Sequence, residues 1–233
     1  MASKDKRNRN MNTEGILKKT RSGDVPCKEE LVYLLGLAPD SAETYMVMGE
    51  STRLSKELSH GKAEVHAQFA INLAPCSCNC LFRSFAETNG VFNEATELSP
   101  EQAVAYARQF EIDGTNAVFM MSTAQYPFGR FVEMVEEVRK NLKPETTLIA
   151  NVGDQTLKNA MRLKRAGFSG VYHAVRLREG VDSTLSVETR KQSIRNYKEA
   201  GLEVGTCVEP IGPEHSNEEL VDMIAFTASL NPS

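Results

Sequence analysis

The sequence predicts an α/β fold with a parallel sheet. From residue 63 onward, short apolar and β-branched runs alternate with amphipathic helical segments. Five such strand–helix units follow one another, with short loops between them, and this pattern is typical of parallel strands joined by right-handed crossovers. Five units fit either an open, doubly wound sheet or part of a β/α barrel. Both architectures place functional groups at the carboxyl ends of the strands.

The N-terminal part of the chain has a different character. Residues 1–24 are rich in lysine and arginine, and we expect a disordered basic tail there, with a nucleic-acid-binding arm as the alternative. Residues 25–61 show helical spacing without strand character, over 26–37 and again over 41–58. The sequence therefore predicts a helical N-terminal segment in front of the sheet.

Residues 62–233 carry the predicted partial barrel. The expected strands cover residues 64–73, 116–122, 147–152, 170–175 and 203–209. The expected helices cover residues 100–112, 129–142, 155–166, 187–200 and 217–230. Capping boxes at Ser99–Gln102 and Ser216–Glu219 mark two of the helix starts. A strand would ordinarily follow the last helix, so we expect that C-terminal strands of the barrel are missing from this chain or supplied by a partner.

Composition limits the possible functions. The chain has 233 residues, of which 41% are hydrophobic, and a net charge of −4, so bulk electrostatics do not suggest nucleic acid as a partner. No apolar run is long enough for a membrane helix, and no apolar signal region opens the chain. The five cysteines are odd in number and clustered, which favours a reducing cytoplasm over a secreted disulfide framework. We expect Cys27 and Cys207 to be packed residues.

Three of these cysteines lie within five residues, directly after the first predicted strand. They are Cys76, Cys78 and Cys80 in the stretch Pro-Cys-Ser-Cys-Asn-Cys-Leu-Phe-Arg-Ser-Phe. Thiols at this density indicate soft-metal ligation or redox chemistry, because one thiol would fill a gap in the core as well as three. The cluster also falls at the carboxyl end of a strand, where the fold class places a functional site.

This loop resembles that of the biotin-synthase-like branch of the radical S-adenosylmethionine enzymes, as do Asn72 and the Leu-Val-Tyr-Leu-Leu stretch of 26–37. The resemblance extends over about residues 26–233. It implies a partial (β/α)6 barrel with a helical N-terminal segment. It also implies a 4Fe–4S cluster held by Cys-x3-Cys-x2-Cys, with S-adenosylmethionine on the remaining iron. Cleavage of S-adenosylmethionine then gives a 5′-deoxyadenosyl radical that takes a hydrogen atom from the substrate.

Residue by residue, the resemblance makes Cys76 and Cys80 the first two cluster ligands. Phe82 matches the aromatic residue that lies by the adenine in the family. The third cysteine of the pattern is replaced by Arg83, and an arginine stays cationic and does not bind iron. Cys78 is the nearby alternative for the third ligand.

Further positions carry weaker parts of the resemblance. Arg190 matches a helix-start arginine that faces the S-adenosylmethionine carboxylate in the family, although a solvated helix arginine is the alternative. Ser122 is a candidate polar contact for the same ligand. Glu209 is a candidate for binding a ribose hydroxyl or the substrate, with an ordinary turn carboxylate as the alternative.

Charged side chains at the end of the fourth predicted strand suggest an anionic ligand. Strand alternation places Arg176 and Arg178 on one face, where we expect them to meet the substrate; the alternative is surface pairing with Glu179. Asn151 ends the third strand and is a candidate pocket donor, whereas we interpret Asp154 first as a helix N-cap.

The sequence thus predicts a radical S-adenosylmethionine enzyme that acts on a small, anionic substrate and receives electrons from a reductant such as ferredoxin or flavodoxin. Self-association is a further option. Two alternatives stay open. One is a non-catalytic or cluster-deficient scaffold of the same fold. The other is a zinc- or divalent-metal-dependent barrel enzyme that uses His66 and His173.

Overall fold

The structure is a computed structural model that describes residues 11–232. The chain divides into two compact units. The larger unit comprises Glu64–Pro210 and the C-terminal residues from Thr227, and it holds the sheet. The smaller unit comprises the N-terminal residues up to Ala63 together with Ile211–Phe226.

The larger unit is built on a five-stranded sheet whose strands are all parallel. The strands are β1 (His66–Ala70), β4 (Ala117–Met121), β5 (Thr147–Asn151), β6 (Gly170–Tyr172) and β7 (Glu203–Gly205). They lie side by side in chain order, β1-β4-β5-β6-β7. A doubly wound sheet would reverse its strand order at a switch point, and this sheet does not. The order therefore confirms the partial β/α barrel of the two predicted architectures.

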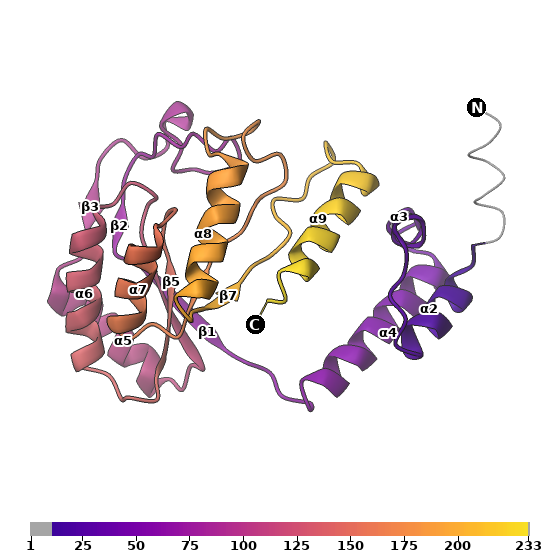
Figure 1. The fold of residues 1–233 in the computed structure, drawn as a ribbon, viewed down its shortest axis with the longest axis horizontal. Coiled ribbons are helices and arrows are strands. Elements are labelled where there is room, and N and C mark those ends of the chain that lie inside the picture. Colours follow the sequence, from indigo (N-terminus) through magenta and orange to yellow (C-terminus); the bar gives the residue numbers. More distant parts are fainter. Residues whose placement is uncertain (1–10, 233) are drawn as a thin grey trace. The chain divides into compact units, whose positions relative to one another are not determined.

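Four helices connect these strands: α5 (Pro100–Ile112), α6 (Phe128–Lys140), α7 (Leu157–Arg165) and α8 (Val187–Glu199). Because the strands advance in one direction and parallel crossovers are right-handed, the connecting helices gather on one face of the sheet. Figure 1 shows α6, α7 and α8 along that face. The capping box predicted for α5 is present: Gln102 N donates to Ser99 Oγ at 3.2 Å, and Ser99 N donates to Gln102 Oε1 at 2.9 Å.

Successive side chains along each strand point alternately to the helix-covered face and to the open face of the sheet. On the covered face, Val118, Met120 and Leu148 are fully buried. On the other face, Phe119 and Asn151 are among the residues that line a cavity of about 800 Å³, called the sheet cavity below. The alternation of side chains along the strands therefore separates the core from a cavity-lining face.

The predicted strand over residues 64–73 is shorter in the structure. β1 ends at Ala70, and the chain then forms a separate two-stranded antiparallel ribbon of β2 (Asn72–Leu73) and β3 (Thr96–Glu97). Ile71 marks the change, because its N–H still donates to Met121 O while its carbonyl accepts from Leu98 N. The cysteine loop follows β2, with the short 3-10 helix η2 (Glu87–Asn89) after it.

The smaller unit corrects the prediction of a disordered tail. Helix α2 (Thr13–Arg21) lies inside the segment that we expected to be disordered, whereas residues 1–10 lie outside the described part of the chain. Ile16 is buried on this helix, and Arg21 pairs with the buried Glu50 at 2.8 Å. The basic composition did not indicate that this segment forms an amphipathic helix, in which Arg21 pairs with Glu50 of α4.

Among the described residues, the remaining helices of this unit are α3 (Lys28–Leu35), α4 (Ala42–Leu58) and most of α9 (Asn217–Ser229). The segment 211–226 groups with the N-terminal helices instead of the sheet, and Lys28 forms an ion pair with Asp222. Cys27 is exposed at the N-cap of α3, so the expectation that it is packed is wrong.

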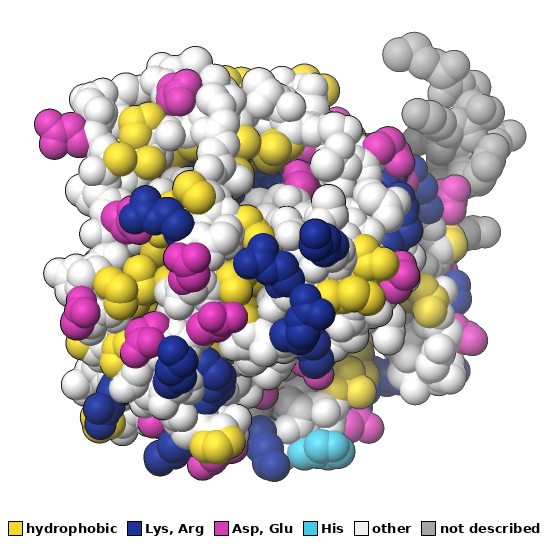
Figure 2. Space-filling model, turned by 60° about the vertical axis from the view of Figure 1, so that its left-hand side comes forward, with side chains coloured by type: hydrophobic (Ala, Val, Ile, Leu, Met, Phe, Trp, Pro, Cys, Tyr) yellow, Lys and Arg dark blue, Asp and Glu magenta, His cyan; other side chains and the backbone are white. Residues whose placement is uncertain are grey.

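The surface is mixed in charge. On the face that Figure 2 presents, Lys and Arg side chains are interspersed with Asp, Glu and apolar side chains. Among residues 11–232, none of the helices combines the length and the apolar character needed to cross a bilayer.

The packing of α6 onto the sheet gives a first testable prediction. Phe131 is 1% exposed and stacks on Phe168, with ring centroids 5.8 Å apart. Phe131→Ala should lower the free energy of unfolding by about 3–5 kcal/mol, because it leaves a cavity in the core. Ile112→Ala is the matched control, since Ile112 is 73% exposed, and should change stability by less than about 0.5 kcal/mol. Denaturant unfolding followed by circular dichroism measures both, and equal losses would contradict the assigned core.

Candidate cofactor and substrate site

The cysteine loop is held at the carboxyl ends of the strands by backbone and amide hydrogen bonds. Cys76 N donates to Phe85 O at 2.7 Å, which closes the loop on itself. Before the loop, the Asn72 side chain forms two hydrogen bonds with Thr123, which lies just beyond the end of β4. Asn72 Nδ2 donates to Thr123 Oγ1 at 2.9 Å, and Asn72 Oδ1 accepts from Thr123 N at 3.0 Å. Asn72 therefore fixes the start of the loop against the sheet.

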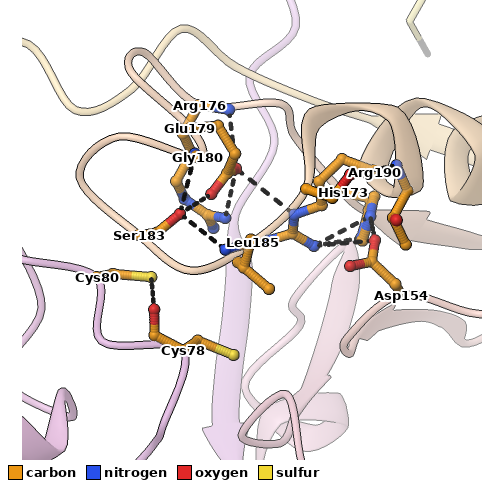
Figure 3. Close-up of polar contacts among 12 residues, drawn as sticks. Cys78, Cys80, Asp154, His173, Arg176, Glu179, Gly180, Ser183, Leu185 and Arg190 are labelled. Atoms are coloured by element: carbon orange, nitrogen blue, oxygen red, sulfur yellow. Dashed lines mark hydrogen bonds and ion pairs between the residues drawn. The ribbon is translucent and has the colours of Figure 1, made fainter.

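All three thiols of the loop line one small cavity of about 60 Å³, called the cysteine pocket below. Cys78 and Cys80 are buried, whereas Cys76 is half-buried. Figure 3 shows Cys78 and Cys80 near each other on the loop, with Cys80 Sγ 4.0 Å from the carbonyl oxygen of Cys78. Arg83 and Arg190 line the same pocket, so its thiols lie near guanidinium groups.

The three thiols differ in acidity. A hydrogen bond from the Cys78 side chain lowers the pKa of Cys76 to about 6 and outweighs the opposing effect of burial; the charge of Arg83 adds to the lowering. The same hydrogen bond, together with burial, raises the pKa of Cys78. Burial raises the pKa of Cys80. Cys76 is therefore the thiolate of the group at neutral pH.

The loop that follows β6 covers the cysteine loop. Leu81 N donates to Asp182 O at 2.9 Å, and Thr184 N donates to Cys78 O at 2.9 Å. Thr184 Oγ1 also donates to Cys78 O at 3.2 Å. Residues about one hundred positions apart in the sequence thus form one wall of the site.

The covering loop carries part of a buried charged network (Figure 3). Its centre is Glu179, whose side chain is fully buried. Glu179 Oε2 lies 3.5 Å from Arg190 Nε and 3.9 Å from Arg176 Nη1. It also accepts from Arg176 N at 3.2 Å, while Glu179 Oε1 accepts from Ser183 Oγ at 2.7 Å. Arg176 reaches a second carboxylate through its Nε, which donates to Glu209 Oε1 at 3.1 Å.

A histidine joins the other side of the network. His173 Nε2 lies 3.0 Å from Asp154 Oδ1, and Arg190 Nη1 lies 3.1 Å from His173 Nε2 and 3.4 Å from Nδ1. Since a guanidinium only donates, we assign the proton to Nε2, which donates to Asp154, and leave Nδ1 as the acceptor for Arg190. Burial lowers the pKa of His173 despite its carboxylate partner, so the imidazole is neutral at pH 7.

Asp154 stays ionised beside this histidine. Burial raises the pKa of Asp154, but the hydrogen bond from His173 and the charge of Arg190 outweigh that effect, so the net pKa is lowered. Arg190 Nη1 lies 3.6 Å from Asp154 Oδ1. The interpretation of Asp154 as the N-cap is wrong, because Thr156 caps α7 by accepting from Asn159 N at 3.3 Å.

Arg176 and Arg178, the two arginines predicted to face the substrate, lie in different surroundings in the structure. Arg176 is 5% exposed within the network, whereas Arg178 is half-exposed and donates through Nε to Asp182 Oδ2 at 2.8 Å. The expectation that they share one face is wrong, because β6 already ends at Tyr172 and strand alternation does not extend to these positions. The alternative, pairing with Glu179, holds for Arg176, but the pair is buried and does not lie at the surface.

The other predicted residues lie as follows. Ser122 lines the cysteine pocket and also a smaller side pocket of about 40 Å³, which Arg83, Tyr172, His173 and Arg190 line as well. Asn151 lines the side pocket and the sheet cavity, and Glu209 lines the sheet cavity. Phe82 is 38% exposed and is not among the residues that line these three cavities.

Sequence reasoning missed the central parts of the network. Glu179 was interpreted as a surface carboxylate and His173 as a packed or zinc-binding residue. The available signal was that Asp154, His173 and Glu209 each lie at or just beyond the carboxyl-terminal part of a predicted strand, and the ends of neighbouring parallel strands meet at one edge of the sheet.

The two histidines proposed as zinc ligands lie at opposite ends of the sheet. His66 opens β1 at the amino end of the sheet, where it pairs with Glu64 at 2.8 Å, whereas His173 follows β6 at the carboxyl end. Within the described part of the chain, no three His, Cys, Asp or Glu side chains are arranged to hold a metal ion, and this includes the three thiols of the cysteine loop. Cys207 is half-buried, with Tyr172 Oη 2.7 Å from its Sγ.

Fold and site together define a partial β/α barrel with a cysteine loop at the carboxyl ends of its strands. The family model of the radical SAM superfamily matches residues 76–227, which begin at the first cysteine of the loop. The chain therefore belongs to the radical SAM superfamily, a family of iron–sulfur proteins that use S-adenosylmethionine.

Curated relatives match at low identity. Biotin synthase 1 from Corynebacterium diphtheriae is 24% identical over 216 residues, which cover 88% of this chain and 60% of that protein. Biotin synthase from Acetivibrio thermocellus is 25% identical over 158 residues, which cover 64% of this chain and 48% of that protein. The chain spans about 60% or less of the length of these two relatives.

Solved structures match in fold. The FeFe-hydrogenase maturase HydG from Carboxydothermus hydrogenoformans aligns with a TM-score of 0.77 and 20% identity, over 97% of this chain and 54% of that one. Methylornithine synthase (PylB) aligns with a TM-score of 0.76 and 17% identity, over 93% and 65% of the two chains. These likenesses confirm the predicted radical-SAM-type barrel.

The donor set of the cysteine pocket fits an iron–sulfur group in part. Cys76 and Cys80 line one pocket, and the pKa of about 6 at Cys76 supplies the thiolate that iron prefers. Position 83 does not fit, because its side chain is a cation. Cys78 is the remaining thiol in the pocket. The residues therefore suit a group held through Cys76 and Cys80, but not one held at position 83.

The buried network should be sensitive to the loss of Glu179. Glu179→Gln leaves two buried arginines short of a counter-charge and should cost about 3–5 kcal/mol of unfolding free energy. Asp182→Asn breaks the more exposed ion pair with Arg178 on the same loop and should cost about 0–1 kcal/mol. Denaturant unfolding of both variants measures the difference. A loss for Glu179→Gln no larger than that for Asp182→Asn would show that the network contributes little.

The acidity of Cys76 predicts a pattern of labelling. Because its pKa is about 6, its thiolate fraction rises between about pH 5 and about pH 7 and then levels off. Iodoacetamide should therefore label Cys76 ahead of Cys78 and Cys80, whose pKa values are raised. Timed labelling with peptide mass spectrometry measures the three rates, and unfolded protein is the control in which they converge. Equal rates in the folded protein would contradict the assignment.

Proposed function

We propose that this chain is a radical S-adenosylmethionine enzyme whose iron–sulfur cluster, of the 4Fe–4S type, is held by Cys76, Cys80 and Cys78. The observation that carries the proposal is the pair Cys76-x3-Cys80, on a loop at the carboxyl ends of the strands and facing one pocket. The family match begins at this pair. When bound, cluster and S-adenosylmethionine would supply a 5′-deoxyadenosyl radical that abstracts hydrogen from a small, anionic substrate.

The chain's own residues prepare the pocket for these ligands. Arg190 is held by Glu179 and Asp154, so its guanidinium keeps one position beside the thiols, where it can meet the carboxylate of S-adenosylmethionine. Ser122 and Asn151 offer hydrogen bonds from the ends of neighbouring strands. Glu209 extends this set into the sheet cavity, which has room for the body of a small substrate.

The proposal also covers the electron donor and the cell compartment of the enzyme. An electron donor such as ferredoxin or flavodoxin supplies the reducing equivalent, and the protein works in the cytoplasm. All five cysteines are free thiols, which suits a reducing compartment. Association with a second copy is the further option.

A second candidate is a cluster-deficient scaffold of the same fold. Arg83 favours it, because a guanidinium lines the cysteine pocket at the place where the family pattern has a thiol. In that case the fold and the buried network persist without radical chemistry.

Anaerobic reconstitution with iron and sulfide tests the proposal. The chain should take up about four irons, as a cubane cluster contains, and the electron paramagnetic resonance of the reduced protein should change when S-adenosylmethionine is added. Cys76→Ala and Cys80→Ala should abolish iron uptake, because each removes a ligand, and Cys78→Ala tests the third ligand. Cys27→Ala is the matched control: this cysteine is exposed in the smaller unit and should leave uptake unchanged.

The opposite result identifies the scaffold. If the unaltered chain takes up no iron and Arg83→Cys restores uptake, the ligand set is incomplete in this protein, and the proposed radical activity is rejected for it.

A further inference from the structure

We propose that the outer face of α7 docks an acidic protein that donates single electrons, through Lys158, Arg162 and Arg165. The inference rests on the proposed function, which needs such a donor, and it names the surface that receives it. This surface is called the α7 face below and consists of these three side chains and Met161. None of the four lines the cysteine pocket, the side pocket or the sheet cavity.

Helix α7 differs in charge from the other α-helices that the structure describes. Its residues, Leu157–Arg165, include four cations and no acidic side chain, whereas each of the other described α-helices contains at least one Asp or Glu. The chain has no acidic residue anywhere between Asp154 and Glu179. Because the net charge of the whole chain is −4, overall composition does not explain this local excess of positive charge.

The spacing of these groups places them on one side of the helix. Lys158, Arg162 and Arg165 follow one another at intervals of four and three positions, so they form one stripe. Met161 lies in the same stripe and is 43% exposed, which adds an apolar contact between the cations. The Arg162 guanidinium lies over the ring of Phe128, 5.2 Å from its centroid, and this contact holds the group without neutralising its charge. Figure 1 shows α7 beside α6 and α8 on the helix-covered face of the sheet.

The cations of the α7 face have no acidic partner of their own. Within residues 11–232, none of the three forms an ion pair with a carboxylate. The neighbouring helices differ in this respect: Lys140 on α6 pairs with Glu137 at 3.2 Å, and Lys191 on α8 pairs with Glu188 at 3.4 Å. The positive charge of the α7 face is therefore available to a partner with an acidic surface.

The stability of α7 explains only part of this pattern. Arg162 and Arg165 lie in the last turn, where the partial negative charge of the helix end favours cations. Lys158 lies in the first turn, where the helix macrodipole disfavours a cation. An acidic partner supplies the favourable interaction that the helix itself does not give to Lys158.

The α7 face begins near the candidate site. Gly153 lines the side pocket together with Arg190, and Lys158 follows Gly153 by five positions. Five residues span at most about 18 Å even when fully extended. A donor held at the first turn of α7 is therefore at the same end of the sheet as the cysteine loop.

The composition of the α7 face favours a protein partner over nucleic acid. Arginine and methionine are enriched at protein–protein interfaces. Nucleic-acid-binding domains typically carry an excess of positive charge overall, and this chain carries a net charge of −4. Complementary charge mainly speeds and orients association. Such binding suits a donor that must dock, deliver one electron and leave.

Binding to the full chain as purified, without iron or S-adenosylmethionine, tests the α7 face. A purified flavodoxin and a purified ferredoxin are the acidic probes, and surface plasmon resonance measures their dissociation constants. At least one should bind, and more weakly at high salt, because exposed charges are screened. Lys158→Glu combined with Arg165→Glu should weaken binding about tenfold or more. Lys56→Glu combined with Lys62→Glu is the matched control: it changes the net charge equally, at exposed positions of the smaller unit, and should bind like the unaltered chain.

Several results would overturn the inference: neither probe binds, the α7 variant binds as tightly as the unaltered chain, or the control variant loses as much affinity. A short DNA duplex is titrated alongside, and DNA binding that is tighter than probe binding and lost in the α7 variant would assign the face to nucleic acid instead. The replaced side chains are exposed, so the melting temperature should not change, and thermal unfolding verifies that each variant is folded.

The test is separate from the cluster. Donor binding without iron uptake would retain the docking surface and reject the radical enzyme, whereas iron uptake without donor binding would do the reverse.

Discussion

One buried carboxylate organises the carboxyl end of the sheet. Glu179 has no exposed side-chain surface, and it shares its charge between Arg176 and Arg190. These arginines in turn reach Glu209 after β7 and Asp154 after β5. Because an unpaired charge in such a place is costly, the loops after three strands are obliged to keep their relative positions. The walls of the candidate site therefore depend on one electrostatic arrangement.

The surroundings of Arg83 depend on the same charged network. The carboxylates of Glu179, Glu209 and Asp154 are each paired with Arg176 or Arg190. Arg83 therefore has no ion-pair partner among them. The cysteine pocket thus combines the three loop thiols with the guanidinium of Arg83, whose charge helps to lower the pKa of Cys76. This combination separates the chain from the simple pattern of its family, while the barrel around it is retained.

Much of the fold could be predicted because its signals are local. Runs of apolar and β-branched residues identified all five strands, and the capping box at Ser99 marked the start of α5 to the residue. The place of the site was also predictable, since parallel strands bring their carboxyl ends to one edge and the cysteine loop follows the first strand. Pairings between distant segments carry no such signal: helix α2 is stabilised partly by Arg21 and Glu50, which lie 29 residues apart.

The sequence by itself determined the class of fold, the cysteine loop and the departure at Arg83, because each depends on residue type and short-range spacing. Only the tertiary structure decided the strand order, which makes the sheet a barrel segment. It also decided that Arg176 is buried while Arg178 reaches Asp182 at the surface. The physical reason is that charge pairing across loops depends on which strand ends become neighbours, and sequence spacing does not encode that.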